Sequence, residues 1–370
     1  MKEPSSFVSW CLSLVCAMAI SVFATNSTRA QAAREDENKV SPTGADQAAA
    51  AESTVTYRHA RPATTPAGAT LKQRDITARR GATRTPASAS SITDNDQLRY
   101  PADLSDFFGG AVVDTAESHA IYLMPKNGSC NKITPCWGNP EGFLFDLSGS
   151  DFIHLVDQYV GMSASHRYTL GVHATISYTP TPKTEPFSDA KIQGIVHAVA
   201  SKTGLSGYGH IYHVFLPPGQ DTCLPSSMTD PDDAACYSPD VPQNFAFCAY
   251  HSSVTFNDKV GHVLYTVEPF QDVSGCSVRP GTPNGQLADS TYNSLSHESI
   301  ETITDPDGSA WFNFTDAGLA GEEIGDECSF FVFTNTGVVF FDPSTVTFNR
   351  RRYAIQPEYS NMEHACATSP

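Results

Sequence analysis

The sequence predicts a single α/β or α+β domain over residues 99–370. Helical and strand-like segments alternate there over about 270 residues, which is the pattern of mixed domains. A chain of 370 residues with 40% hydrophobic and 10% aromatic side chains is able to bury such a core. The charge also divides near residue 99. Residues 33–99 carry ten basic and eight acidic side chains, whereas the rest of the chain from residue 100 carries 11 basic and 31 acidic ones.

The predicted elements follow one another along this domain. Ile192, Ile195 and Val199 form a helical stripe, and Pro306 ends the last predicted helix. Helices are expected at 152–160, 189–203 and 287–304. Strands are expected at 120–124, 168–178, 211–216, 330–333, 338–341 and 352–355, with a hairpin formed by 245–256 and 262–267.

The N-terminus predicts export. Lys2 is followed by a mainly apolar run from Phe7 to Phe23, and 30–32 (AQA) fits a small-x-small cleavage site. We therefore expect a signal peptide over 1–32 and a secreted protein, extracellular or periplasmic, with an uncleaved membrane anchor as the alternative. Residues 33–98 are rich in Ala, Thr, Ser, Pro and Arg without apolar periodicity, which predicts a disordered spacer or a propeptide.

Cysteine usage agrees with export. Beyond the predicted signal peptide the number of cysteines is even and no pair of CxxC motifs occurs, which predicts up to four disulfides in an oxidising compartment. Proximity in the sequence favours Cys130–Cys136 and Cys223–Cys236, while eight cysteines allow about 105 pairings. The predicted disulfide cysteines are Cys130, Cys136, Cys223, Cys236, Cys248, Cys276, Cys328 and Cys366.

The net charge of −17 sets two classes of partner aside. An acidic protein repels nucleic acid and anionic membranes, so we expect no nucleic-acid partner and no membrane contact after signal cleavage. The sequence contains no Gly-x-Ser-x-Gly motif, phosphate-binding loop or dinucleotide fingerprint. Serine hydrolases, NTPases and dehydrogenases are therefore not expected.

The segment 297–301 (HESIE) carries the strongest chemical pattern. Positions four apart lie on one face of a helix, so His297 and Glu301 are placed to hold one metal ion. Glu298 is placed beside them to take a proton from metal-activated water. This is the arrangement of the H-E-x-x-H zinc hydrolases with Glu in place of the second His, and zinc accepts a carboxylate ligand. An amphipathic helix with a charged outer face is the alternative.

A second acidic cluster at 322–328 offers further ligands. Zinc needs a third protein ligand from another element, and we expect Glu323 to supply it. Asp326 is expected to orient the imidazole by accepting its other N–H. An acidic surface turn fixed by a Cys328 disulfide is the alternative.

Two further residues are weighed for this site. His251 is predicted to face it and to stabilise an oxyanion, with a hydrogen-bonded structural histidine as the alternative. Asp305 lies eight residues after His297 and would share its helix face, in a supporting role outside the ligand set. Pro306 favours a helix-ending turn at Asp305 instead.

Four motifs, in this order, resemble the secreted EXORDIUM or phosphate-induced protein family of plants and its bacterial relatives. Together they span about residues 101–368 and leave out the predicted spacer. The matching pieces are 212–219 (YHVFLPPG), 248–251 (CAYH), 296–306 (SHESIETITDP) with Trp311 and 323–328 (EIGDEC), and 355–361 (IQPEYSN) with Cys366.

The resemblance implies a secreted protein with a single zincin-like domain, a mixed sheet, an active-site helix and several disulfides. Two functions remain open. The first is a zinc-dependent hydrolase, foremost a peptidase, that cleaves a peptide or protein substrate with zinc held by His297, Glu301 and Glu323. The second is a non-catalytic extracellular or cell-wall-associated protein, which the missing second histidine favours and whose acidic cluster would bind calcium or orient loops.

Overall fold

A computed structural model describes residues 54–59, 102–106, 108–126, 130, 136–162, 166–179, 186–227, 230–238, 245–314, 316 and 318–370, with the backbone alone at 54–59, 225–227 and 230–234. The predicted signal peptide lies outside the described residues. So does the predicted spacer, except for strand β1 (Thr54–His59), which pairs with the strand that carries His251.

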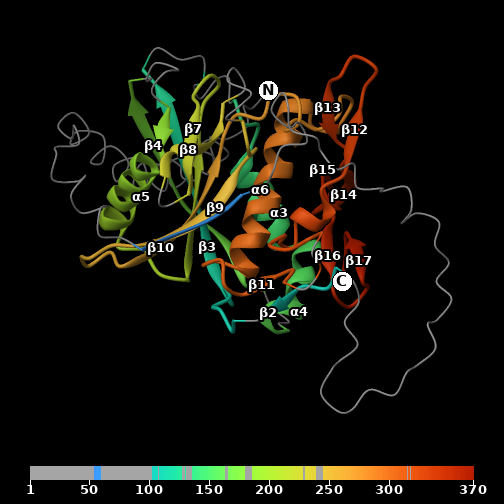
Figure 1. Cartoon of the computed structure of the whole chain (residues 1–370), viewed down its shortest axis with the longest axis horizontal. Helices are drawn as coiled ribbons and strands as arrows, with labels where there is room; N and C mark the ends of the chain where they lie inside the picture. The colour runs from blue at the N-terminus through green and yellow to red at the C-terminus, as the bar shows by residue number, and fades with distance from the viewer. Residues whose placement is uncertain are drawn as a thin grey trace, which may run out of the picture. The chain divides into compact units, whose positions relative to one another are not determined.

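A mixed sheet of six strands forms the centre of the domain (Figure 1). Its strand order is β1-β9-β10-β6-β3-β4. Strands β10, β6, β3 and β4 are parallel to one another, whereas β9 is antiparallel to both β10 and β1. The bounds are β3 (Ala116–Pro125), β4 (Tyr168–Tyr178), β6 (His210–Phe215), β9 (Tyr250–Thr255) and β10 (His262–Glu268).

Helices cover both faces of this sheet (Figure 1). Helix α5 (Asp189–Thr203) packs on one face, against β6 and β10. The other face is covered by α3 (Pro140–Ser148), the 3₁₀ helix η3 (Phe152–Val156), α4 (Asp157–Val160) and α6 (Gln286–Thr304). The strand period of two divides the side chains between two cores: Ile211 and Phe215 of β6 pack on the α6 side, and Tyr212 and Val214 on the α5 side.

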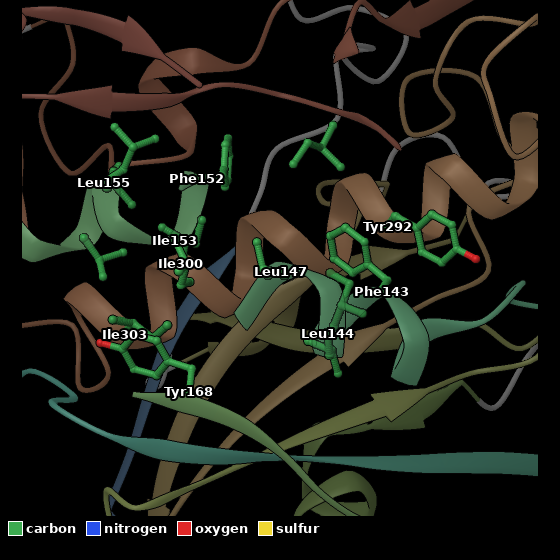
Figure 2. Close-up of a cluster of buried hydrophobic side chains, with 14 of the residues drawn as sticks. Phe143, Leu144, Leu147, Phe152, Ile153, Leu155, Tyr168, Tyr292, Ile300 and Ile303 are labelled. Carbon is green, nitrogen blue, oxygen red and sulfur yellow. The ribbon is translucent and has the colours of Figure 1, made fainter. Parts of the chain in front are cut away.

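The core on the α6 side joins α6 to α3 and η3 (Figure 2). Ile300 and Ile303 of α6 and Phe143 of α3 are at most 2% exposed. The Phe143 ring stacks on Tyr292 with centroids 5.1 Å apart. Burying aliphatic and aromatic side chains of this size stabilises the fold by about 1.5–3 kcal/mol each, so this core fixes α6 against the sheet.

Helix α6 is buried along almost its whole length, from residue 289 to 304. Some of its polar side chains bond to the helix itself, since the hydroxyls of Ser299 and Thr302 donate to carbonyls four residues earlier. The helix ends at Asp305, whose Oδ1 accepts the N–H groups of Ser309 and Ala310, directly before Pro306. The position of the proline predicted this turn.

Small two- and three-stranded sheets surround the centre. Their bounds are β2 (Ser105–Asp106) with β11 (Trp311–Phe312), β5 (Phe187–Ser188) with β7 (Thr222–Ser227) and β8 (Asp230–Tyr237), β12 (Phe331–Phe333) with β13 (Val339–Phe341), β14 (Ser344–Phe348) with β15 (Arg351–Ile355), and β16 (Glu358–Ser360) with β17 (Ala365–Ala367). A 3₁₀ turn, η4 (Asp326–Cys328), precedes β12.

All eight predicted cysteines form disulfides, which confirms the prediction of four. The two pairs favoured by proximity, Cys130–Cys136 and Cys223–Cys236, are both present. The other pairs are Cys248–Cys276 and Cys328–Cys366. Such a set suits an extracellular or otherwise oxidising compartment. No helix among the described residues is long and apolar enough to span a membrane.

Candidate metal centre

Strands β9 and β10 direct polar side chains toward α6. Tyr250 and Val254 of β9 pack into the core on the α5 side, so His251 between them points the other way. The same alternation turns Glu268 of β10 toward α6, because its neighbour Val267 belongs to the opposite core. His251 and Glu268 are each 1% exposed.

Helix α6 contributes His297, Glu298 and Glu301, which are at most 2% exposed. His297 and Glu301 share a face, as their spacing of four predicted, and His297 Nε2 lies 3.2 Å from Glu301 Oε1. Glu298 lies next to them, with its Oε1 4.0 Å from His297 Nε2. The helix thus delivers an imidazole and two carboxylates to one place.

The loop at 323–326 closes the site from the other side. Gln356 Nε2 donates to the Gly325 carbonyl at 2.7 Å, and the Tyr359 N–H donates to the Ile324 carbonyl at 2.9 Å. These bonds, with the Cys328–Cys366 disulfide, hold the loop against β16. Asp326 Oδ1 consequently lies 3.7 Å from His297 Nε2, and the Asp326 N–H donates to Glu301 Oε1 at 3.2 Å.

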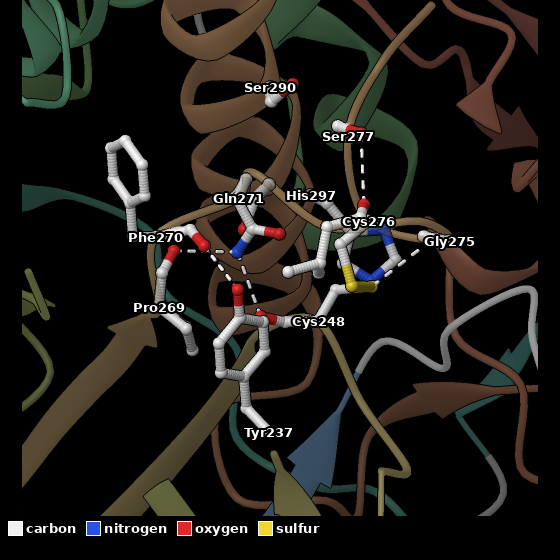
Figure 3. The surroundings of a disulfide bond; sticks show 12 residues. Tyr237, Cys248, Pro269, Phe270, Gln271, Gly275, Cys276, Ser277, Ser290 and His297 are labelled. Atoms are coloured by element: carbon white, nitrogen blue, oxygen red, sulfur yellow. Dashed lines mark hydrogen bonds between the residues drawn. A yellow bond between two sulfur atoms is a disulfide. The ribbon is translucent and has the colours of Figure 1, made fainter. Parts of the chain in front are cut away.

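The disulfide Cys248–Cys276 supports the strand that carries His251. Cys248 lies three residues before His251, and its carbonyl accepts a hydrogen bond from Gln271 Nε2 at 2.9 Å. His297 lies in the surroundings of this disulfide (Figure 3). The start of β9 is therefore fixed by a covalent bond and a buried amide next to the site.

His251 faces the carboxylates of α6. Its Nδ1 lies 3.4 Å from Glu298 Oε2 and 3.6 Å from Glu301 Oε2. Its Nε2 lies 3.2 Å from the backbone carbonyl of Asp305 and 3.7 Å from Glu323 Oε1. Because a carbonyl only accepts, Nε2 donates its proton to Asp305, and Nδ1 is the ring nitrogen that faces the carboxylates of Glu298 and Glu301.

The structure distributes the predicted residues over two groups whose ligand atoms lie within 4.8 Å of one another. One group contains His297, Glu301 and Asp326, and the other contains His251, Glu301 and Glu323. Asp326, predicted to orient an imidazole from outside the ligand set, thus takes the place beside His297 and Glu301 that we expected for Glu323. Glu323 instead lies with His251, which was predicted to stabilise an oxyanion.

Several buried atoms of the site have no hydrogen-bond partner among the described residues. They include both ring nitrogens of His297, both carboxylate oxygens of Glu298, Glu301 Oε2 and His251 Nδ1. Leaving a buried polar group without a partner costs roughly 1–3 kcal/mol, and more for a charged one. Imidazole and carboxylate are the ligands of zinc and related ions, so these atoms fit a metal.

Protons take the place of a cation in the metal-free chain. Burial lowers the pKa of His251, but the carboxylates of Glu298 and Glu301 outweigh it and raise that pKa to about 9. The pKa of His297 is raised well above its usual value, chiefly because the charge of Glu301 overcomes the effect of burial. Burial raises the pKa of Glu298 and of Asp326. A metal binding here would displace such protons.

Two buried glutamates next to the site were not predicted. Glu358 of β16 is fully buried, and both of its oxygens lack a hydrogen-bond partner among the described residues. Glu268 accepts from Thr266 Oγ1 at 2.9 Å and from Ser294 Oγ at 2.6 Å. For Glu268, the signal in the sequence was an acidic residue directly after the predicted strand over 262–267.

A third group, Glu117, His119 and His210, lies on β3 and β6 and satisfies itself. The Val172 N–H donates to His119 Nδ1 at 3.0 Å, so the ring proton is on Nε2. Nε2 then donates to His210 Nδ1 at 3.0 Å. Burial, followed by the nearby His210, lowers the pKa of His119 to about 4, so the ring is neutral. Neither nitrogen of His119 has a lone pair left for a metal.

Comparisons with family models, with curated protein sequences and with solved structures find no match to this chain.

Proposed function

We propose that this protein is a secreted, zinc-dependent hydrolase, foremost a peptidase, on a zincin-like domain, related to the secreted EXORDIUM-type proteins that its motifs resemble. The observation that carries the proposal is the cluster of buried His297 and Glu301 with partly buried Asp326, beside the carboxylate of Glu298. A mixed sheet beside one buried helix supports it. Four disulfides fit export.

The donor set favours zinc over calcium. Calcium takes oxygen ligands almost alone, whereas each group here includes an imidazole. Imidazole with carboxylate suits zinc and its neighbours in the first transition row. Calcium, expected for the acidic cluster if the protein is not an enzyme, would leave both histidines unused.

Each residue of the site has its own role in the proposed hydrolysis. A zinc ion held by His297, Glu301 and Asp326 supplies Lewis acidity, which polarises a peptide carbonyl and acidifies water. Glu298 accepts the proton of the attacking water and passes it to the leaving amine. Burial raises the pKa of Glu298, which makes its carboxylate a stronger base than an exposed one. The N–H of His251 is held by the Asp305 carbonyl, which orients the ring beside Glu298.

The substitution Glu298→Gln tests this function, because it keeps the shape of the side chain and removes the base. We expect zinc to remain bound while cleavage of a fluorogenic peptide library falls by about 10²–10⁴-fold. The control is Glu363→Gln, which removes an exposed carboxylate far from the site and should leave cleavage unchanged. Equal cleavage by Glu298→Gln and the natural chain would contradict the proposal.

Burial of the site favours a second candidate, a non-catalytic extracellular or wall-associated protein stabilised by its metal. His251, His297, Glu298, Glu301 and Glu323 are each at most 2% exposed. Structural zinc sites are closed, whereas catalytic ones keep a position open to water and substrate. If the folded, zinc-loaded natural chain cleaves no peptide and zinc removal only lowers its melting temperature, this second candidate replaces the first.

A further inference from the structure

We propose that the site holds two divalent cations of the first transition row, joined by the carboxylate of Glu301. The inference rests on the metal-binding part of the proposed function and extends it from one ion to two. Among the described residues, Glu301 is the only one shared by the group of His297 and the group of His251.

The two oxygens of Glu301 face different histidines. Oε1 lies 3.2 Å from His297 Nε2, and Oε2 lies 3.6 Å from His251 Nδ1. A carboxylate that serves a single ion directs one or both oxygens to the same point. Here each oxygen is directed to its own imidazole, which is the arrangement of a carboxylate bridging two ions about 3.5–4 Å apart.

Each side of this bridge has its own terminal carboxylate. Asp326 Oδ1 lies 3.7 Å from His297 Nε2, and Glu323 belongs to the group of His251. Each ion would therefore have one imidazole, one terminal carboxylate and one oxygen of Glu301. Three protein ligands are what a zinc site with an open position requires.

The surrounding structure presents the right atoms of His251. The Asp305 carbonyl accepts its Nε2–H at 3.2 Å, and Nδ1 is buried without a hydrogen-bond partner among the described residues. A hydrogen bond of this kind sets the tautomer and ring orientation of metal-ligating histidines. The ring nitrogen that faces Glu301 is thus the one left for a metal, and Glu323 Oε1 lies 3.7 Å from the other nitrogen, Nε2.

Buried carboxylates are concentrated at the site. Glu298, Glu301, Glu323 and Glu358 are at most 1% exposed, and Asp326 lies beside them. In the described part of the chain, every ion pair of Glu298 and Glu301 is with a histidine. Cations bound here would replace the protons that these side chains hold in the metal-free chain.

Glu298 faces both histidines of the site. Its Oε2 is 3.4 Å from His251 Nδ1, and its Oε1 is 4.0 Å from His297 Nε2. Its two oxygens face different histidines, so Glu298 would be placed to accept a proton from water if both ions were bound.

Metal stoichiometry tests the inference without reference to activity. The full chain is stripped with a chelator, dialysed against excess Zn²⁺ and analysed for zinc per chain, with circular dichroism as the check on folding. We expect two zinc ions per natural chain and one for each of Asp326→Asn and Glu323→Gln. Loaded with Mn²⁺, the natural chain should show the paramagnetic resonance spectrum of an exchange-coupled pair, and Glu301→Gln should lose the coupling.

His210→Asn is the matched control, since it removes a histidine from the third group. Its zinc content should remain two, and a fall to one would place the second ion on β6 and overturn the inference. A single zinc in the natural chain, or two uncoupled Mn²⁺ ions, would also overturn it while leaving the proposed function intact. No bound zinc in the folded natural chain would overturn both.

Discussion

Gly325 is the residue on which the geometry of the ligands depends most directly. A Cβ atom at this position would lie 2.4 Å from His297 Nδ1 and 3.0 Å from Glu301 Oε1. Its backbone, with φ −81° and ψ −41°, would accept any residue. The requirement for glycine therefore comes from the imidazole packed against it and not from the turn.

Gly325→Ala should consequently damage both the metal site and the fold. The added methyl group pushes His297 or the 323–326 loop away, and we expect zinc affinity to fall at least tenfold, about 1.4 kcal/mol. The free energy of unfolding of the metal-free chain should fall by roughly 1–3 kcal/mol, as for other overpacked cores. Gly194→Ala on α5, where a Cβ meets nothing within 4 Å, is the control. Unchanged zinc affinity of Gly325→Ala in competition titrations would show that the contact with Gly325 does not position the His297 ring.

His213 gives the fold an acid-sensitive point away from the ligands. It is fully buried, its Nδ1 lies 3.0 Å from Thr266 Oγ1, and burial, with the nearby His119 adding to it, lowers its pKa from 6.5 to about 3. Between pH 6.5 and 3, His213 is therefore protonated in the unfolded chain and neutral in the folded chain. The stabilisation that His213 contributes is complete above pH 6.5 and is lost as the pH falls.

The loss of the His213 contribution in acid predicts how the unfolding free energy depends on pH. Relative to pH 7, His213 should cost the natural chain up to roughly 3 kcal/mol of unfolding free energy at pH 4.5, since each pKa unit is worth about 1.4 kcal/mol. His213→Asn keeps a polar group near Thr266 but does not titrate, so its unfolding free energy should change less over the same range. Urea unfolding of both chains at the two pH values measures the difference. Equal pH dependence would mean that His213 is not buried neutral.

At the scale of elements, the sequence patterns predicted helices and strands that depend on interactions between residues close in the sequence. The helix over 189–203 and the strand over 168–178 have the predicted bounds, and the hairpin of β9 and β10 is present. Residues 152–160 form η3 and α4 in place of one helix. Helix α3 was missed, although Asn139 caps it by accepting the Gly142 N–H at 3.1 Å and Pro140 follows at the first position.

The candidate site shows the same limit. The spacing of His297 and Glu301 on one helix predicted their contact, because that contact is local. The assignment of Asp326 to His297 and of Glu323 to His251 depends on how the 323–326 loop docks on β16, which the sequence around each residue does not encode. Glu358 enters the site for the same reason.

The disulfide Cys328–Cys366 should matter to both the loop and the fold. It closes a separation of 38 residues and begins directly after the loop that holds Asp326. Chain-entropy arguments give such a cross-link roughly 4 kcal/mol. The double variant Cys328→Ser with Cys366→Ser should lose about that much unfolding free energy in denaturant titrations and should bind zinc more weakly. The matched control is Cys130→Ser with Cys136→Ser. This variant removes a disulfide that spans only six residues, so it should lose less unfolding free energy. Equal losses in both variants would contradict this role of the loop.

At the scale of the whole molecule, one core packs α6 on the central sheet and a second core packs α5 on its other face. The strongly acidic balance of −17 predicted a protein that repels polyanions. The structure adds that part of this acidity is buried, around two histidines at the centre of the domain. Composition cannot distinguish buried from exposed carboxylates, so the metal centre follows from the fold and not from the charge count.

Anomalous scattering from crystals of the zinc-loaded protein tests the metal centre most directly. Data collected on both sides of the zinc absorption edge should show a peak about 2.0–2.1 Å from His297 Nε2, in contact with Glu301 and Asp326, and a second peak beside His251 Nδ1. A well-ordered His297 that is hydrogen-bonded to Glu301, with no anomalous peak within coordination distance of its ring, would contradict this metal centre.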